Sequence, residues 1–243
     1  MTSLKILSGG AAQGLVASLA PAFKEQTGLA IEGEFGAVGA MAGKMRGGTP
    51  ADIVVLTAAL IADLVRENRL TRESVSDIGR VETAIAVRTG DPLASVDDAA
   101  SLRAVLLGAD AIFVPDTKAS TAGIHVAKVL QQLGIAEAVE ARLRIYPNGA
   151  TAMRHLAVSD AARPVGCTQS TEIVSTKGVK LSGSLPRGCD LSTVYTAAVA
   201  TCAAHARQAQ VLIDLLTGVD QGKLRERAGF LNTKDRASQQ IAP

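Results

Sequence analysis

The sequence predicts an α/β protein with two lobes, and three observations support this prediction. Short apolar runs alternate with segments of helical spacing along most of the 243 residues. The alternation stops at a turn-forming stretch, Gly90-Asp91-Pro92, and then restarts. Hydrophobic residues make up 47% and charged residues 20%, which is typical of an ordered globular chain. At this length the chain can form two lobes, each with its own core. We therefore expect mixed, mostly parallel sheets.

The first lobe is predicted from the pattern before residue 90. Apolar runs predict strands at residues 4–7, 29–35, 53–56 and 83–87. Helices are expected at residues 11–26, 40–45 and 58–67, where Leu15, Leu19 and Phe23 share one face of the first helix. Pro21 lies inside that helix and is expected to kink it. Strands that alternate with helices in this way form a mostly parallel sheet covered on both faces.

The second lobe is predicted from the pattern that follows. Helices are expected at residues 99–107, 120–133 and 148–157, and strands at residues 111–114 and 165–168. The stretch 182–186 is expected to form a loop. A last strand at residues 194–199 and a helix at residues 206–216 are expected to return to the first lobe. This organisation predicts lobe I from residues 1–84 and 191–243, and lobe II from residues 85–190.

Composition excludes several classes of function. The 25 basic and 23 acidic residues are interspersed and sum to a net charge of +2, so a nucleic-acid partner is not expected. Aromatic residues make up only 2%, which disfavours sites built on stacked rings. The cysteines and histidines lack the spacing of metal ligands, so we expect no metal, cofactor or disulfide. No stretch reaches the ~20 apolar residues that a membrane span needs.

The first 20 residues have two interpretations. Lys5 followed by apolar and Ala-rich residues resembles a signal peptide, but Gly9-Gly10 and Gln13 interrupt the apolar run. The segment fits a strand, a glycine turn and a helix, which is the interpretation we prefer. On that interpretation the chain as given is either cytoplasmic or the mature form of a periplasmic protein.

Four predicted helices begin with small or hydroxyl residues directly after a strand. A helix start offers unpaired backbone N–H groups and the positive end of the helix dipole, so small residues there let an anion approach. In open α/β sheets these turns meet at the carboxyl edge of the strands. We therefore expect a small anion to bind in a cleft between the lobes. The four turns are Ser8-Gly9-Gly10-Ala11-Ala12, Gly36-Ala37-Val38-Gly39-Ala40, Ser120-Thr121-Ala122-Gly123 and Asn148-Gly149-Ala150-Thr151.

Several of these segments, in order along nearly the whole chain, resemble the type II periplasmic solute-binding proteins, in particular the molybdate-binding branch. The most specific piece is Gly47-Gly48-Thr49-Pro50-Ala51-Asp52-Ile53. The others are 35–40, 120–124, 130–134, 165–166 and 171–172, together with the first strand and turn. The resemblance implies two α/β lobes joined by crossing strands. It also implies a bound anion and, for an exported chain, a partner in the membrane component of an ABC transporter.

The chain departs from the molybdate binders where they bind the oxyanion. The resemblance implies hydroxyl residues in the first two turns, but Ala11 and Val38 stand there, although Ser8 lies near. A Tyr of that family is replaced by Gln169. The expected ligand-binding residues combine the four turns with a later polar run. They are Ser8, Gly9, Gly10, Ala11, Ala37, Val38, Ser120, Thr121, Asn148, Thr151, Thr168, Gln169 and Ser170. Amide and hydroxyl groups both donate and accept hydrogen bonds, which suits carboxylates as well as oxyanions.

Two function hypotheses follow. The first is a binding protein for a small anion, either a carboxylate or an oxyanion. The second is an isomerase or tautomerase of a small polycarboxylate, because aconitate isomerase is similar to the molybdate-binding proteins. Such an enzyme needs a base beside an acidic C–H group. The titratable candidates near the predicted turns are Lys118, His125 and Glu172.

Overall fold

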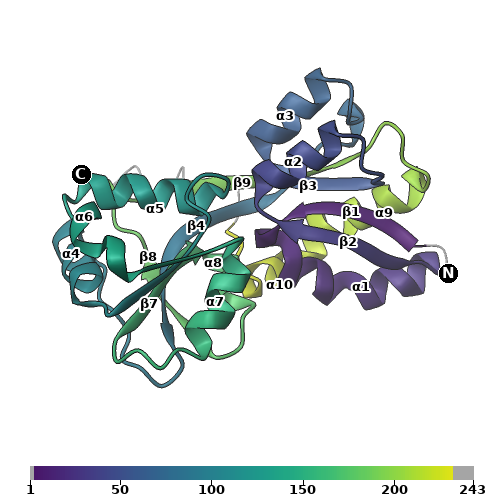
Figure 1. The fold of residues 1–243 in the computed structure, drawn as a ribbon. Helices are drawn as coiled ribbons and strands as arrows, with labels where there is room; N and C mark the ends of the chain where they lie inside the picture. Colours follow the sequence, from purple (N-terminus) through teal and green to yellow (C-terminus); the bar gives the residue numbers. More distant parts are fainter. Residues whose placement is uncertain (1–2, 232–243) are drawn as a thin grey trace, which may run out of the picture. The chain divides into compact units, whose positions relative to one another are not determined.

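The protein was analysed as a computed structural model, in which residues 3–231 are described. The chain forms two compact units (Figure 1). One is built from the chain up to Val81 together with the chain from Thr193 onward, and the other is Glu82–Ser192. From the sequence, these boundaries were predicted after residues 84 and 190. None of the helices within residues 3–231 is long and apolar enough to cross a bilayer.

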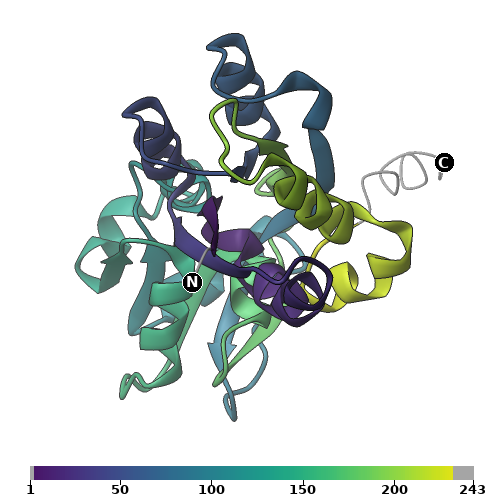
Figure 2. The same cartoon turned by 90° about the vertical axis from the view of Figure 1, so that its right-hand side faces the viewer.

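The first unit contains four strands in the order β2-β1-β3-β9. Their bounds are β1 Ser3–Gly9, β2 Ala30–Gly36, β3 Ile53–Thr57 and β9 Ser192–Val199. The first three run parallel, while β9 is antiparallel to β3. The helices of the unit are α1 Gln13–Thr27, α2 Val38–Arg46, α3 Ala58–Arg66, α9 Ala206–Thr217 and α10 Gly222–Arg227. The 3₁₀ turns are η1 Gly10–Ala12, η2 Arg72–Ser74 and η4 Val219–Gln221. Figure 2 shows the strands and helices of this unit from a second direction.

Helix α1 shows why the core of this unit forms. Leu15, Leu19 and Phe23 lie three to four residues apart, so one face of the helix is apolar and packs into the core. Pro21 remains inside the helix, which continues to Thr27 and ends at Gly28. Gly28 has φ of 73°, a left-handed conformation that glycine adopts without steric cost.

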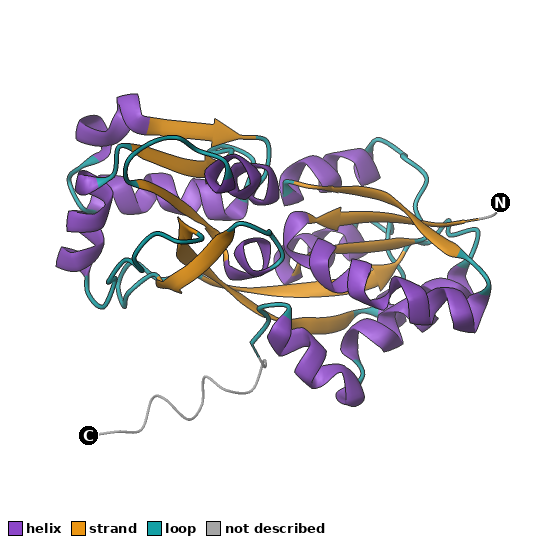
Figure 3. Ribbon diagram, turned by 90° about the horizontal axis from the view of Figure 1, so that it is seen from below, coloured by secondary structure: helices purple, strands orange, loops and turns teal. Residues whose placement is uncertain are grey.

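The second unit contains five strands, with β7 between β4 and β5, β6 on the outer side of β5, and β8 paired to β4. Their bounds are β4 Ser76–Arg88, β5 Ala111–Pro115, β6 Leu143–Tyr146, β7 Pro164–Gln169 and β8 Val179–Ser184. Strands β5, β6 and β7 run parallel, and β4 is antiparallel to β7 and β8. The helices are α4 Ala99–Gly108, α5 Thr121–Gln132, α6 Ala136–Val139, α7 Gly149–Ala157 and α8 Ser170–Val174, with the 3₁₀ turn η3 Glu140–Arg142 (Figure 3).

The sheet of the second unit separates two apolar clusters. Ile85, Val165 and Cys167 pack on one face with α5. Ala84 and Ala86 pack on the other face, together with residues of α7. Successive side chains of a strand point to opposite faces, so the parity of a position on β4 or β7 decides which cluster it joins.

The predicted strands and helices are confirmed to within a few residues, with several differences. The stretch 182–186 was predicted as a loop, but β8 extends to Ser184 and pairs with β4. Strand β6 and the short helices α6, α8 and α10 were not predicted. Strand β8 contains Gly183, and its apolar and polar residues alternate poorly. Its sequence pattern therefore does not mark it as a strand, and its pairing with β4 identifies it. Strand β4 is longer than predicted because Ser76–Glu82 carries the chain into the second unit.

Candidate functional site

In the second unit, three helices begin at one edge of the sheet. Strands β5, β6 and β7 are parallel, so their carboxyl ends meet at the same edge. Helices α5, α7 and α8 follow these strands directly or after a short turn. Ligands of open α/β sheets bind at such an edge because the backbone N–H groups of helix starts point toward it.

Gln169 and Thr83 lie opposite each other at this edge. They are direct partners in the antiparallel pairing of β7 with β4, so their side chains lie on the same face. By strand alternation this is the face of Cys167 and Ile85, which α5 covers. Thr168 belongs to the opposite face, because its hydroxyl lies at Gly149, the first residue of α7. The predicted polar run at the end of β7 is therefore divided between the two faces.

Several side-chain polar atoms at this edge are buried without a hydrogen-bond partner among the described residues. They include Oγ1 of Thr83, both Nε2 and Oε1 of Gln169, and Oγ1 of Thr171. These three side chains are 1%, 3% and 2% exposed. A buried polar group without a partner costs about 1–3 kcal/mol, and most buried polar groups in folded proteins are paired. This cluster is therefore a place where an external ligand can supply the missing hydrogen bonds.

The start of α5 lacks a side-chain cap. Ser120 is the N-cap residue and is buried, but its hydroxyl does not bond the first turn of the helix. Helix α4 provides a contrast within the same unit. There Asp98 accepts from the backbone N–H of Ser101 at 2.7 Å, and the Ser101 hydroxyl reciprocates, forming a capping box. An uncapped start leaves backbone donors available for an anion.

Close packing explains why glycine stands at position 123 of this helix. A Cβ atom at this position would lie 2.1 Å from the carbonyl oxygen of Asp116. Asp116 in turn organises the loop before α5, because its carboxylate accepts from the backbone N–H groups of Lys118 and Ala119. Thr121, the first residue of α5, is half-buried.

The start of α7 is occupied by groups of the protein itself. The side chain of Asn148 accepts from the backbone N–H of Thr151 at 2.8 Å and caps the helix. The hydroxyl of Thr151 accepts from Arg154. The carboxylate of Glu172 accepts from the hydroxyl of Thr168 at 2.6 Å. Asn148, Thr151 and Thr168, all predicted ligand-binding residues, thus have partners within the protein.

Glu172 is buried, with 5% of its surface exposed. Burial raises the pKa of its carboxyl group, and this effect outweighs the hydrogen bonds that act in the opposite direction. Besides the hydroxyl of Thr168, these bonds come from the backbone N–H groups of Ala150, Gln169 and Gly149. The same carboxylate therefore joins the starts of α7 and α8.

The three titratable candidates differ in their surroundings. Lys118 is exposed. His125 uses Nε2 in a 2.8 Å hydrogen bond with the carbonyl oxygen of Cys189, which ties α5 to the segment before β9. Glu172 lies on the face of Thr168, opposite that of Gln169. Within the second unit, the structure thus does not gather the three at the cluster of unpartnered polar atoms.

In the first unit, the predicted ligand-binding residues at the corresponding edge are mostly small or apolar. Ser8 is fully buried and its hydroxyl donates to the carbonyl oxygen of Gly9 at 2.9 Å, so it already has an acceptor. A Cβ atom at Gly9 would lie 2.8 Å from Val38 and 2.9 Å from Tyr195, which explains the glycine. Ala11 is buried as well. The residues Gly9, Gly10, Ala37 and Val38 offer backbone groups and small surfaces but no side-chain donor.

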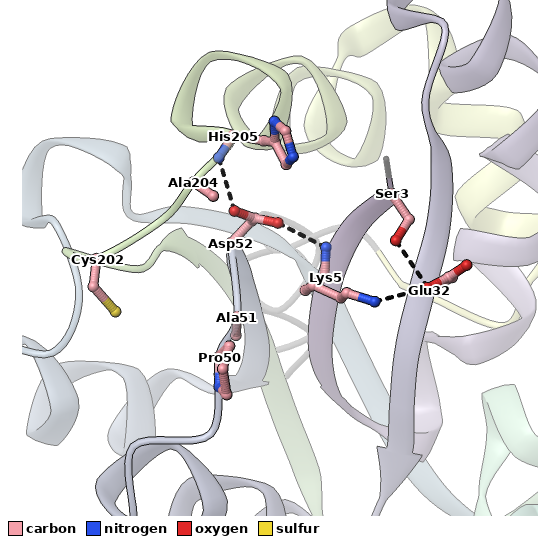
Figure 4. Close-up of a pocket in the computed structure, with 9 residues that line it drawn as sticks. All are labelled: Ser3, Lys5, Glu32, Pro50, Ala51, Asp52, Cys202, Ala204 and His205. Atoms are coloured by element: carbon pink, nitrogen blue, oxygen red, sulfur yellow. Dashed lines mark hydrogen bonds and ion pairs between the residues drawn. The ribbon is translucent and has the colours of Figure 1, made fainter. Parts of the chain in front are cut away.

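The opposite edge of the first unit holds a cavity of about 340 Å³ (Figure 4). Asp52, from the motif that carries the resemblance, lies here, is 2% exposed, and accepts from two backbone N–H groups. These are Lys5 at 2.7 Å and His205 at 2.8 Å. Asp52 therefore fastens β1 and the start of α9 to the strand β3. The cavity also contains the exposed thiol of Cys202 and an exposed ion pair between Lys5 and Glu32.

Sequence reasoning missed Thr83, Thr171 and Ser192. Ser192 lies next to Leu191, whose carbonyl oxygen accepts from the backbone N–H of Thr83, and its hydroxyl is also unpartnered among the described residues. In the sequence, Thr83 could have been noticed as a hydroxyl residue at the first position of the apolar run 83–87. Its meaning depends on Gln169 lying opposite, which only strand pairing reveals. No group of three potential metal ligands is found among residues 3–231.

The comparisons with known proteins agree with this architecture. An aconitate isomerase from Pseudomonas sp. is 23% identical over 236 residues, covering 95% of this chain and 88% of that protein. The molybdate-binding protein ModA of Escherichia coli (strain K12) is 22% identical over 216 residues, covering 87% and 82%. The structure of the Azotobacter vinelandii periplasmic molybdate-binding protein matches with a TM-score of 0.78 at 19% identity, covering 94% of this chain and 99% of that one.

The fold and the family predicted from the sequence are thereby confirmed. Residues 4–231 match the family described as bacterial extracellular solute-binding protein, which is nearly all of the described chain. The chain belongs to this family of bacterial extracellular solute-binding proteins.

Proposed function

We propose that the chain binds a small organic acid, and that the unpartnered polar cluster around Gln169 contacts it. The carrying observation is that both polar atoms of the Gln169 amide are buried and lack partners among the described residues. Thr83 and Thr171 add two hydroxyl groups that can donate or accept. The uncapped start of α5 adds backbone donors for a negative charge.

The chemistry of the amide favours a carboxylic acid over a tetrahedral oxyanion. Nε2 of Gln169 donates and is satisfied by a carboxylate oxygen, whereas Oε1 accepts and needs a donor. A fully deprotonated oxyanion only accepts hydrogen bonds, so it leaves Oε1 unpaired. A carboxylate that also carries a hydroxyl group satisfies both atoms. In the first and second turns of the first unit, Ala11 and Val38 offer an oxyanion no hydroxyl, and the hydroxyl of Ser8 already donates to the carbonyl oxygen of Gly9.

The relatives support an anionic solute. One is named for molybdate and another for aconitate, which are both anions at neutral pH. The family is extracellular, which supports an exported protein that delivers its solute to the membrane component of a transporter. That both units hold the same solute molecule stays a prediction.

A thermal-shift titration tests the proposal. Binding at a concentration 100 times the Kd stabilises the folded state by about 2.7 kcal/mol, or roughly 5–10 °C for a chain of this size. We expect hydroxycarboxylates to raise the Tm most, and Gln169→Ala to abolish the shift. Gln26→Ala, at an exposed position of α1, serves as the matched control. A shift with molybdate or sulfate alone, or an unchanged shift in Gln169→Ala, contradicts the proposal.

The second candidate function is isomerisation of a small polycarboxylate. It is favoured by the aconitate isomerase relative, which aligns with 95% of this chain. Such a reaction removes a proton beside a carboxylate and returns it at another carbon, so the substrate exchanges with solvent. Incubation with cis- or trans-aconitate in heavy water distinguishes the two functions. Isomerisation with deuterium uptake supports the enzyme, while binding without either supports a carrier.

A further inference from the structure

The surroundings of Glu172 resemble those of a bound anion. Its carboxylate accepts from the hydroxyl of Thr168 at 2.6 Å, and the backbone N–H groups of Gly149, Ala150 and Gln169 act on it to lower its pKa. Gly149 and Ala150 are the first residues of α7, a helix of nine residues. Backbone N–H groups at a helix start are the donors that proteins use for phosphate and carboxylate ligands.

The fit between the carboxylate and the helix start is tight. A Cβ atom at Gly149 would lie 1.9 Å from Oε2 of Glu172 and 2.1 Å from Oγ1 of Thr168. No side chain larger than hydrogen fits between the helix start and the carboxylate. The Thr168 hydroxyl and these backbone N–H groups favour the ionised carboxylate and oppose the burial that raises its pKa.

We propose that Glu172 is a built-in anion that fills the start of α7, excludes the solute from it, and positions Gln169. The positioning acts through Thr168, the neighbour of Gln169 on β7, whose hydroxyl bonds the carboxylate at 2.6 Å while the Gln169 side chain lies on the opposite face. Only the link to solute binding rests on the proposed function. Glu172 is a positioning residue, because it contacts Thr168 and the start of α7 rather than the solute.

If Glu172 fills the start of α7, the negatively charged group of a solute has to bind at another helix start of the second unit. Two of the longer helices of the second unit, α5 and α7, begin at the sheet edge where its parallel strands end. The start of α7 is filled by Glu172 and capped by Asn148. Helix α5 begins without a side-chain cap at buried Ser120. We therefore expect the acid group of the solute to bind at α5 and its uncharged part to reach Gln169.

Chemical rescue tests the built-in anion directly. Glu172→Ala removes the carboxylate and leaves a space of similar size at the helix start. We expect this variant to have a lower Tm, and sodium formate to raise the Tm in a saturable manner. Formamide at the same concentration, which has a similar shape and no charge, is expected to have little effect. Sodium chloride at matched ionic strength corrects for general salt effects.

The controls distinguish this mechanism from general stabilisation. Glu140→Ala changes an exposed position of the same unit. The Tm of this variant and of wild type should rise no more with formate than with chloride. Glu172→Gln fills the space but turns an amide NH₂ toward N–H donors, so it should lose Tm and not respond to formate. If Glu172→Ala is unfolded without additive, the same titration is read as refolding yield by circular dichroism.

The results separate this inference from the proposed function. Equal effects of formate and formamide on Glu172→Ala, or a Tm of Glu172→Gln equal to that of wild type, would overturn the built-in anion. Rescue by formate without binding of any organic acid to wild type would leave Glu172 assigned and reject the proposed function. With both in place, Glu172→Gln should bind the acid more weakly than wild type, while Glu140→Ala binds it equally.

Discussion

Replacement of Gly149 by alanine is the sharpest test of how the start of α7 is packed. The added Cβ would lie 1.9 Å from the Glu172 carboxylate and 2.1 Å from the Thr168 hydroxyl, both of which are buried. Over-packing in a dense interior costs about 1–3 kcal/mol. Displacing the carboxylate from its N–H donors costs about 1.5–3 kcal/mol more, since bonds to charged groups are the strong ones. We expect a total loss of about 2.5–6 kcal/mol.

Equilibrium urea unfolding, followed by circular dichroism, measures this loss. Gly108→Ala is the matched control, because Gly108 ends helix α4 of the same unit and a Cβ there meets nothing within 4 Å. In a helix, alanine is more favourable than glycine by up to about 1 kcal/mol, so the control should be neutral or more stable. Equal stability of the two variants would refute the packing argument and the position assigned to Glu172.

Three further predictions follow from buried and capping groups. Alkylation at pH 8 should modify exposed Cys202 first and leave Cys167 unmodified in the folded protein, since burial raises the pKa of the Cys167 thiol to about 12; mass spectrometry of the labelled chain checks this. Asp52→Ala should lower the free energy of unfolding in urea by about 3 kcal/mol or more, because two backbone N–H groups lose a charged acceptor. The control Glu73→Ala, at an exposed position, should change it by less than about 0.5 kcal/mol. The Ser101 backbone N–H lowers the pKa of Asp98 below 3.8, so this group stabilises the fold above pH 3.8 and loses that effect as the pH falls through the lowered pKa. The stability difference between wild type and Asp98→Ala should therefore shrink in acid, and a constant difference between pH 7 and pH 3 would contradict the capping role.

The apolar runs and the helical stripes were sufficient to predict most elements. The stripe of Leu15, Leu19 and Phe23 identifies α1 because helical periodicity places these residues on one face. The runs at β3 and β5 are buried at every position, so their composition alone marks them as central strands. Strand β8 escaped prediction because an edge strand with Gly183 carries little pattern of its own.

The candidate site was predicted less completely. Ser120 was identified as part of a helix start, and Gln169 from the family resemblance and the polar run that follows a buried strand; that they contact a ligand stays a prediction. Thr83 was missed, since its pairing partner is 86 residues away and is set by the antiparallel register of β4 and β7. Asn148 and Thr168 were expected to face a ligand, but Thr151 and Glu172 satisfy their polar groups.

The alternation of strands and helices could be inferred from the residues alone, as could the small helix starts and the family resemblance. These features depend on local periodicity and on residue size, which are readable along the chain. The tertiary structure decided which face of the sheet each polar residue joins and which helix start is already filled. The reason is that Glu172 reaches Gly149 across 23 positions of sequence, and no local pattern records a carboxylate that serves as a ligand for its own fold.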